Sequence, residues 1–179
     1  GKKVAGIWKR DWKEPFVIGT FTTNSTPVIR ISRYFNKDTV VLTDGKNMTI
    51  YRGEISDSKD RQKEFLKTAK IIKTDNAITS VTMDNAGRFI VAQSGATLQT
   101  YDLERKELSS AFNIGMAQEV KWLDNFYIRS VSASGKMEIR EFDGTNAHTL
   151  ISVKPGLDSV LSSNQRYVYG LTTNASGKI

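Results

Sequence analysis

Short apolar stretches alternate with polar turns along the chain, and many have the two-residue period of a β-strand. In KMEIRE, residues 136–141, Met137 and Ile139 point to one face, and Lys136, Glu138 and Arg140 point to the other. Helical periodicity is confined to residues 57–72, where four residues would share one helix face: Phe65, Leu66, Ala69 and Ile72. We interpret this segment as an extended connection into a strand, with room for a helical turn. The pattern predicts an all-β protein.

The strand-and-turn pattern repeats with a nearly constant period. Glycines in one turn are spaced by 50, 40 and 42 residues: Gly45, Gly95, Gly135 and Gly177. Asparagines in an earlier turn are spaced by 49, 40 and 39 residues: Asn36, Asn85, Asn125 and Asn164. An Asn or Asp side chain can cap its own backbone in a turn and tolerates positive φ, and Gly permits the chain to reverse. Two landmarks with one period indicate a tandem repeat.

Each repeat reads as four short antiparallel strands, and a period of about 40 residues with four strands matches the blade of a β-propeller. The expected fold is therefore β-propeller-type, with about four four-stranded antiparallel blades in a single domain of residues 1–179. The predicted boundaries are a half blade at 1–21, full blades at 26–74, 77–114 and 117–154, and a partial blade at 156–179.

Two ways of closing such a repeat are open. The first and last segments combine into one shared blade of a small four-bladed ring, which hides the sheet edges. Alternatively, the chain is part of a propeller with more blades, which the glycine start and the unfinished last unit favour. An open arc would leave unpaired edges, so we expect it to associate with itself or with a missing portion.

Three motifs resemble those of known propellers. LQTYDLERKEL and MEIREFDG resemble the third-strand endings of Trp-Asp-repeat (WD40) propellers, where an aromatic–Asp pair closes the strand, and MDNAGRFIV is similar to a turn of bacterial WD40-like propellers. No unit contains the Gly-His or Trp-Asp dipeptide, and Phe142 lies one residue farther from its glycine than Tyr51 and Tyr101 do. The whole resembles propeller modules of bacterial surface proteins, including those with PEGA domains. That resemblance implies an extracytoplasmic or cell-surface location.

Composition narrows the chemistry. The 179 residues are 39% hydrophobic and 25% charged, which is typical of a globular domain, and no apolar run is long enough to span a membrane. The absence of cysteine excludes disulfides, zinc–thiolate sites and cysteine nucleophiles. The net charge of +7 is concentrated in residues 1–13 and 56–73. We interpret these segments as solvated surface, with nucleic-acid binding as a less favoured alternative.

Residues capable of catalysis are few. His148 is the only histidine, which excludes a metal site built from several histidines, and we interpret it as a polar residue at a strand edge. Asp102 and Asp143 follow third-strand aromatics in successive units, and a carboxylate pair can serve acid–base chemistry. An acid in that position also accepts backbone hydrogen bonds from a turn, which is the role we expect. We predict no catalytic, cofactor-binding or metal-binding residue.

Aromatic residues provide the best candidate binding site. Trp122, flanked by Val120 and Leu123, is expected in the core. Two other tryptophans alternate with basic residues near the N-terminus, and such a patch can stack on sugars or bases unless a further half blade covers it. The candidate partner-binding residues are Trp8, Lys9, Arg10, Trp12 and Lys13.

Three functional hypotheses follow. The leading one is a non-enzymatic propeller scaffold, part of a longer bacterial protein, that binds a protein or polysaccharide partner. The second is a propeller enzyme acting on a sugar or another small substrate in the axial channel. The third is binding of an anionic polymer through the basic segments.

Overall fold

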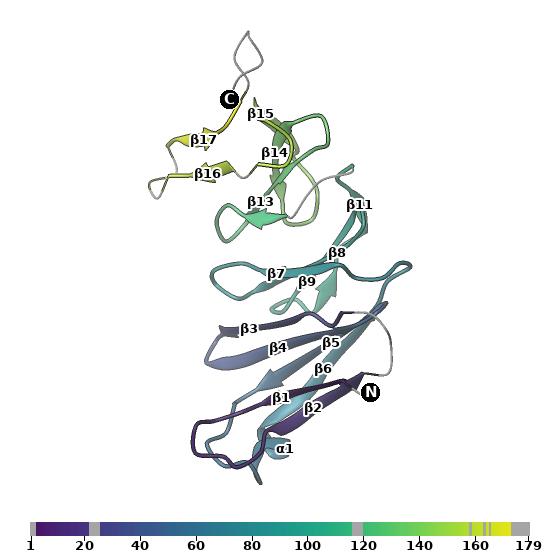
Figure 1. The fold of residues 1–179 in the computed structure, drawn as a ribbon, viewed down its shortest axis with the longest axis vertical. Helices are drawn as coiled ribbons and strands as arrows, with labels where there is room; N and C mark the ends of the chain where they lie inside the picture. Colours follow the sequence, from purple (N-terminus) through teal and green to yellow (C-terminus); the bar gives the residue numbers. More distant parts are fainter. Residues whose placement is uncertain are drawn as a thin grey trace.

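The structure is a computed structural model that describes residues 3–21, 26–115, 120–157, 159–162, 164 and 166–172. Nearly all of its regular structure is antiparallel β-sheet, and five sheets follow one another along the long axis of the molecule (Figure 1). The prediction of an all-β fold is confirmed.

A two-stranded hairpin lies at each end of this series. The N-terminal hairpin consists of β1 (Lys3–Ile7) and β2 (Phe16–Phe21). The C-terminal hairpin consists of β16 (Ser159–Leu161) and β17 (Val168–Gly170).

Three larger sheets lie between the hairpins, and in each of them the first four strands lie side by side in chain order. The first sheet contains β3 (Ile29–Tyr34), β4 (Lys37–Asp44), β5 (Asn47–Gly53) and β6 (Leu66–Lys73). The second sheet contains β7 (Ser80–Met83), β8 (Phe89–Ser94), β9 (Thr97–Asp102), β10 (Glu107–Leu108) and β11 (Phe112–Asn113). The third sheet contains β12 (Lys121–Trp122), β13 (Tyr127–Val131), β14 (Lys136–Glu141) and β15 (His148–Ser152).

The long connection in the first sheet contains one helical turn, α1 (Gln62–Phe65), directly before β6. The buried side chain of Gln62 closes this connection: its Oε1 accepts from the Ser56 N–H (3.0 Å) and its Nε2 donates to the Glu54 carbonyl (3.2 Å). The structure thus agrees with the interpretation of residues 57–72 as an extended connection with a helical turn.

The fourth strand of the second sheet is interrupted, which the sequence pattern did not predict. Both β10 and β11 pair with β9, and Ser109 lies between them. The Ser109 hydroxyl accepts from the Thr100 N–H (3.0 Å), while the Ser109 N–H donates to the Thr100 carbonyl (2.8 Å). A side-chain hydroxyl therefore takes the place of a backbone acceptor, and the regular ladder is broken.

The glycine turns follow the prediction where they are described. Gly45, Gly95 and Gly135 all have positive φ, and Gly177 lies outside the described residues. At Gly135, with φ +77°, an added Cβ would lie 2.2 Å from the Val153 carbonyl oxygen. Only glycine fits this turn without moving the connection that leads to β16.

Each sheet is held by apolar contacts with its neighbours. In β4, Val40 and Leu42 face the N-terminal hairpin, and Val41 faces the opposite side, where the second sheet packs. Because strand side chains alternate between faces, one strand supplies both interfaces. The second and third sheets meet around Val91 and Ile128, and the third sheet meets the C-terminal hairpin around Met137.

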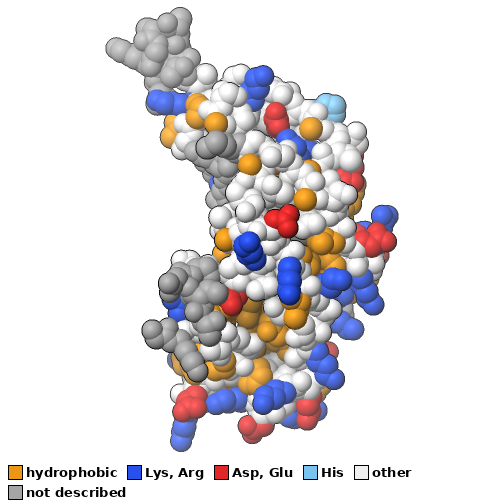
Figure 2. Space-filling view, turned by 90° about the vertical axis from the view of Figure 1, so that its right-hand side faces the viewer, with side chains coloured by type: hydrophobic (Ala, Val, Ile, Leu, Met, Phe, Trp, Pro, Cys, Tyr) orange, Lys and Arg blue, Asp and Glu red, His pale blue; other side chains and the backbone are white. Residues whose placement is uncertain are grey.

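The sheets form an open arc. The strand β7 contacts both β3 and β12, so the first strands of the three larger sheets adjoin one another. The N-terminal and C-terminal hairpins lie at opposite ends of the molecule, and their described residues share no ladder (Figure 1). In the side view the molecule bends around a hollow (Figure 2). In the part of the chain that the structure describes, the two hairpins do not form the shared blade of a four-bladed ring.

Candidate functional site

The five candidate partner-binding residues all lie in the turn that joins β1 to β2. The Trp12 N–H donates to the Lys9 carbonyl (2.9 Å), and the Trp8 indole Nε1 donates to the Trp12 carbonyl (3.0 Å). These bonds fix the turn, although Trp8 remains 63% exposed. We call the set Trp8, Lys9, Arg10, Trp12 and Lys13 the N-terminal patch.

Two ion pairs connect this turn to the long connection of the first sheet. Lys9 Nζ lies 2.7 Å from Asp57 Oδ1, and Lys59 Nζ lies 3.6 Å from Glu14 Oε2. The hydrogen bond between Lys9 and Asp57 raises the pKa of Lys9 and lowers the pKa of Asp57. The charge of Lys9 is therefore already balanced within the molecule.

The remaining cations of the N-terminal patch are differently placed. Arg10 and Lys13 are exposed and form no ion pair within the part of the chain that the structure describes. Together with Trp8 they present an apolar ring and two positive charges to the surroundings. This arrangement suits a partner that offers an aromatic or aliphatic group beside a carboxylate.

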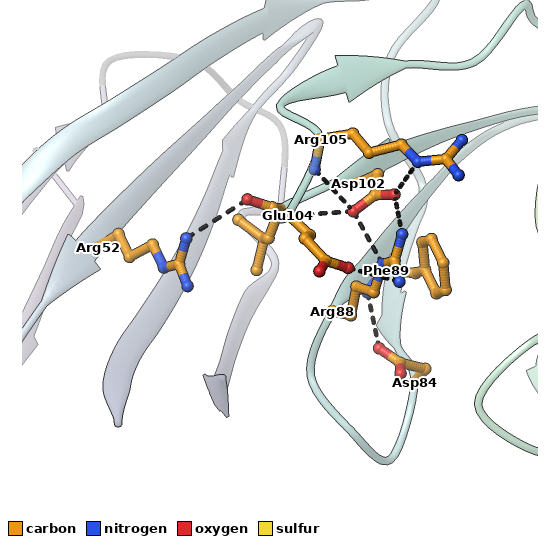
Figure 3. A network of polar contacts seen from close by, with 8 residues as sticks. Arg52, Asp84, Arg88, Phe89, Asp102, Glu104 and Arg105 are labelled. Carbon is orange, nitrogen blue, oxygen red and sulfur yellow. Dashed lines mark hydrogen bonds and ion pairs between the residues drawn. The ribbon is translucent and has the colours of Figure 1, made fainter. Parts of the chain in front are cut away.

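A network of charges lies at the end of the second sheet where β8 begins and β9 ends (Figure 3). The Arg88 guanidinium binds Asp102 in a bidentate manner, with Nε 3.0 Å from Oδ1 and Nη2 2.7 Å from Oδ2. Its Nη1 also lies 2.5 Å from Glu104 Oε2. The backbone N–H groups of Glu104 and Arg105 donate to Asp102 Oδ1. The network fixes the turn between β9 and β10.

Asp102 is nearly buried, and two opposing effects act on its pKa. Burial alone would raise the pKa, because it disfavours the charged form. The hydrogen bonds from Arg88 and from the backbone of Glu104 and Arg105 favour the charged form, and the net pKa lies below its usual value. Asp102 is thus an ionised structural anchor, as its position in the turn led us to expect.

The sequence predicted equivalent positions for Asp102 and Asp143 in successive units. The structure shows that Asp143 does not occupy the position of Asp102. Counted from the first residue of the third strand, Arg140 stands where Tyr101 stands, and Phe142 and Asp143 lie beyond the strand. Asp143 Oδ1 accepts from the Thr145 N–H (3.0 Å) and hydroxyl (2.6 Å). Asp102 and Asp143 do line the same cavity of about 340 Å³, but both carboxylates are engaged in turns.

Two of the turns before the second strands are capped by an Asp, one of the two residue types expected there, and not by the Asn that marked the repeat. Asp84 Oδ1 accepts from the Phe89 N–H (2.7 Å), and Asp124 Oδ1 accepts from the N–H groups of Phe126 and Tyr127 (2.7 and 2.6 Å). The capping side chain in these two units is therefore the Asp before each Asn. The Asp-Asn dipeptides at 84–85 and 124–125 are the sequence feature from which these caps could have been predicted.

The predicted asparagine role is correct at the other two turns. Asn36 has φ +54°, and Asn164 Oδ1 accepts from the Arg166 N–H (3.1 Å). Among these capping residues, Asp84 has a raised pKa. Burial raises the pKa of its carboxyl group, and hydrogen bonds from backbone N–H groups offset only part of this rise. The second oxygen of Asp84, Oδ2, is buried and has no hydrogen-bond partner among the residues that the structure describes.

Trp122 packs at the interface of the second and third sheets, as expected for a core residue. Its ring lies 6.1 Å from that of Phe89, which in turn stacks on Phe142 with ring centroids 4.1 Å apart. Phe126 packs edge-on against Phe142 at 5.0 Å. These rings hold the two sheets together rather than forming an exposed binding surface, apart from the partly exposed Phe126.

Other candidate chemistry is sparse. His148 begins β15 at the open edge of the third sheet, where it is exposed and pairs with Ile139. Within the described ranges, no three His, Cys, Asp or Glu residues lie close enough together to hold a metal ion. In the same ranges, no helix has the length and apolar character needed to cross a membrane.

Two solved structures share this arrangement of sheets at very low sequence identity. The C-terminal WD40 domain of Sif2 matches 85% of this chain with 13% identity and a TM-score of 0.54. A protein from Bacteroides fragilis described as a 6-phosphogluconolactonase matches 99% of this chain with 9% identity and a TM-score of 0.55. The chain has a WD40-like β-propeller fold. No protein-family model and no curated protein sequence matches it.

The likeness concerns the fold alone, because propellers of similar shape carry different functions. The matched part is 44% of the Sif2 domain and 56% of the Bacteroides protein, so the chain spans about half the length of these structures. This agrees with an open arc of about four blades.

Proposed function

We propose that this propeller is a non-enzymatic scaffold that binds a protein partner through the N-terminal patch. The observation that carries the proposal is the exposed Trp8 ring, held by its bond to Trp12 and flanked by Arg10 and Lys13 without ion-pair partners among the described residues. Tryptophan and arginine are the residues that most often dominate protein interfaces, and a ring that is already ordered loses little entropy on binding.

The ties to the first sheet support this role. The Lys9–Asp57 and Lys59–Glu14 pairs attach the turn to a neighbouring sheet, so the patch is presented on a fixed support. Because exposed ion pairs contribute little individually, their value here is in orientation rather than stability. The resemblance of the turn MDNAGRFIV to a turn of bacterial WD40-like propellers further supports placing this scaffold in a longer bacterial surface protein.

An enzymatic role has less support. One of the two similar folds carries an enzyme's name, but at 9% identity it offers no residue-level comparison. The carboxylates that share the cavity between the second and third sheets, Asp102 and Asp143, are both bound by neighbouring donors. A general acid or base must be able to reach a substrate, which these geometries do not favour.

The test is selection of a displayed random-peptide library on the immobilised protein. Enriched peptides should carry an apolar side chain next to an acidic one, and should bind the triple variant Trp8→Ala/Arg10→Ala/Lys13→Ala about tenfold more weakly. The double variant Arg166→Ala/Tyr167→Ala is the matched control, because it removes an exposed aromatic–basic pair at the other end of the molecule.

Peptides that bind the triple variant and the wild type equally would refute the proposed patch. A second outcome would also contradict a protein partner. If no peptide is selected but a polysaccharide or a single-stranded nucleic acid binds through the same residues, the ligand of the patch belongs to that other class.

A second proposal concerns the ends of the arc: we propose that copies of this chain associate through them. The C-terminal hairpin supplies the first two strands of a four-stranded unit, and the N-terminal hairpin supplies the last two. Among the described residues, β1 and β17 each pair along one edge only. Val4, Val160 and Tyr169 are more than half exposed on these hairpins. Open edges with apolar faces favour strand pairing between molecules.

A further inference from the structure

A cavity of about 520 Å³ lies between the first and second sheets, and four of its eleven lining residues are basic. Phe65, Tyr101 and Leu103 form apolar parts of its wall. The charged residues that line it are Lys37, Arg52, Lys67, Lys106, Glu54 and Glu64. Its volume falls in the range of sites for small molecules. We call it the basic cavity.

Arg52 is the most constrained of these cations. It extends from β5 toward the second sheet (Figure 3), where Nη1 lies 3.4 Å from the Leu103 carbonyl, while Nη2 lies 3.3 Å from the Tyr34 carbonyl. Both are long hydrogen bonds to neutral acceptors, and Nε is buried with no acceptor. Three of its five N–H donors thus have no acceptor among the described residues.

Arg52 differs from Arg88 in having no carboxylate partner among the described residues. Arg88 contacts two carboxylates, Asp102 and Glu104, whereas Arg52 contacts none in the described structure. A half-buried guanidinium without a counter-charge is energetically unfavourable, because burial removes part of its hydration. An anion in the basic cavity would supply the missing charge.

The three lysines that line the basic cavity add further positive charge that no carboxylate in the described structure pairs with. Lys67 lies directly opposite Arg52 in the β5–β6 ladder, and like charges in opposite positions destabilise a sheet. Lys106 is brought to the cavity by a turn in which it has φ +59°, a conformation that costs energy for a non-glycine residue. None of Lys37, Lys67 and Lys106 forms an ion pair within the described ranges.

The carboxylates in the cavity only partly balance these charges. Glu64 pairs with Arg61, which does not line the cavity, and Glu54 is the other acid. Four cations against two carboxylates leave two positive charges in the cavity. A dianion with a planar or tetrahedral set of oxygens would match both this charge and the donor groups of Arg and Lys.

We infer that the basic cavity is a binding site for a small phosphate monoester, with the phosphate group between Arg52, Lys67 and Lys106 and the organic part against Phe65 and Tyr101. The site is independent of the N-terminal patch, so it does not rest on the proposed scaffold function. It lies between two sheets, and ligand binding there also links them.

Calorimetric titration with phenyl phosphate tests the site, with inorganic phosphate and benzoate as comparison ligands. Phenyl phosphate should bind with 1:1 stoichiometry, more tightly than inorganic phosphate because of its ring and more tightly than benzoate because of its second charge. Affinity should fall between pH 8 and pH 5, since the second pKa of a phosphate ester is about 6.

Variants keep the test specific. Lys67→Gln and Lys106→Gln each remove one exposed cation and should each weaken phenyl phosphate binding about fivefold or more. The matched control is Lys70→Gln, on the same strand as Lys67 but outside the cavity lining, and it should change affinity less than about twofold.

Three results would overturn the inference. The first is absence of phenyl phosphate binding to the wild type. The second is an equal loss in Lys67→Gln and Lys70→Gln, which would show attraction to general surface charge. The third is equal affinity for benzoate and phenyl phosphate at pH 8, which would exclude selection of a dianion.

Discussion

Arg88 and Asp102 form a bidentate ion pair across the β8–β9 ladder, with nitrogen–oxygen distances of 3.0 and 2.7 Å. The pair joins the first residue before β8 to the last residue of β9, and Asp102 also receives two backbone N–H groups from the next turn. One carboxylate therefore holds two strands and a turn in place.

Replacement of Asp102 by Asn should destabilise the fold strongly. The variant leaves Arg88 without its main counter-charge at a mostly buried position, and the expected loss in the free energy of unfolding is about 2–3 kcal/mol. Urea unfolding measures this loss. Asp143→Asn is the matched control, since the hydrogen bonds of Asp143 to described residues lie within its own turn, and should cost less than about 1 kcal/mol. Equal effects would contradict the assigned role of Asp102.

The pH dependence of stability should have opposite signs at Asp102 and Asp84. The pKa of Asp102 is lowered in the folded state, so its stabilisation is complete above its unfolded pKa of about 4 and is lost as pH falls through the folded value. The pKa of Asp84 is raised, so its contribution is present at low pH and is lost as pH rises through the folded value.

Unfolding free energies of Asp102→Asn and Asp84→Asn, measured between pH 3 and pH 7, test these signs. The deficit of Asp102→Asn relative to the wild type should shrink at the acid end. Asp84→Asn should improve relative to the wild type as pH rises, because it removes a charge that burial disfavours while keeping an oxygen for the Phe89 N–H. Parallel curves for both variants and the wild type would contradict the assigned pKa directions.

The contacts between sheets should carry most of the stability. Ile50 has no exposed surface and lies between the first and second sheets, whereas Ile71, on the neighbouring strand, is 56% exposed. Ile50→Ala should cost about 3–4 kcal/mol through lost burial and the cavity it leaves, and Ile71→Ala less than about 0.5 kcal/mol. A comparison of the two by chemical denaturation checks the packing, and similar losses would count against it.

Local patterns predicted the repeating part of this molecule well. The alternation of Met137 and Ile139 with charged residues marked β14, and the turns at Gly45, Gly95 and Gly135 were recognisable because only a few residue types adopt positive φ. Register was harder to predict. The aromatic–acid pair at 142–143 looked equivalent to Tyr101–Asp102, but the pattern could not show that β14 had already ended.

Contacts between distant residues could not be predicted from one sequence. Lys9 and Asp57 are 48 positions apart, and Arg52 reaches the Leu103 carbonyl across 51 positions. Both contacts depend on how neighbouring sheets pack, which the strand pattern leaves undetermined. The N-terminal patch could be predicted because its residues lie within six positions of one another, whereas the basic cavity could not, because its residues come from two sheets.

The tryptophans should differ in their access to solvent. Trp8 is 63% exposed beside Arg10 and Lys13, while Trp122 is half-buried next to Phe89. Iodide, an anion, should therefore quench Trp8 most effectively, and Trp8→Phe should remove most of the quenchable fluorescence. Trp122→Phe, as the control, should leave a more quenchable remainder. The reverse order would mean that the N-terminal patch is covered, as a further half blade would cover it.

Self-association through the hairpins should depend on their outward apolar faces. Tyr169 is 62% exposed on β17, and Val160 lies opposite it on β16. Lysine at either position places a charge on the face that a partner hairpin would cover, so Val160→Lys and Tyr169→Lys should shift the protein toward monomer in sedimentation velocity. Leu108→Lys is the matched control, since Leu108 is also exposed, at 39%, but lies on β10 in the second sheet, away from both hairpins. If the wild type is monomeric at high micromolar concentration, or if all three variants behave alike, the hairpin ends do not bind a second copy.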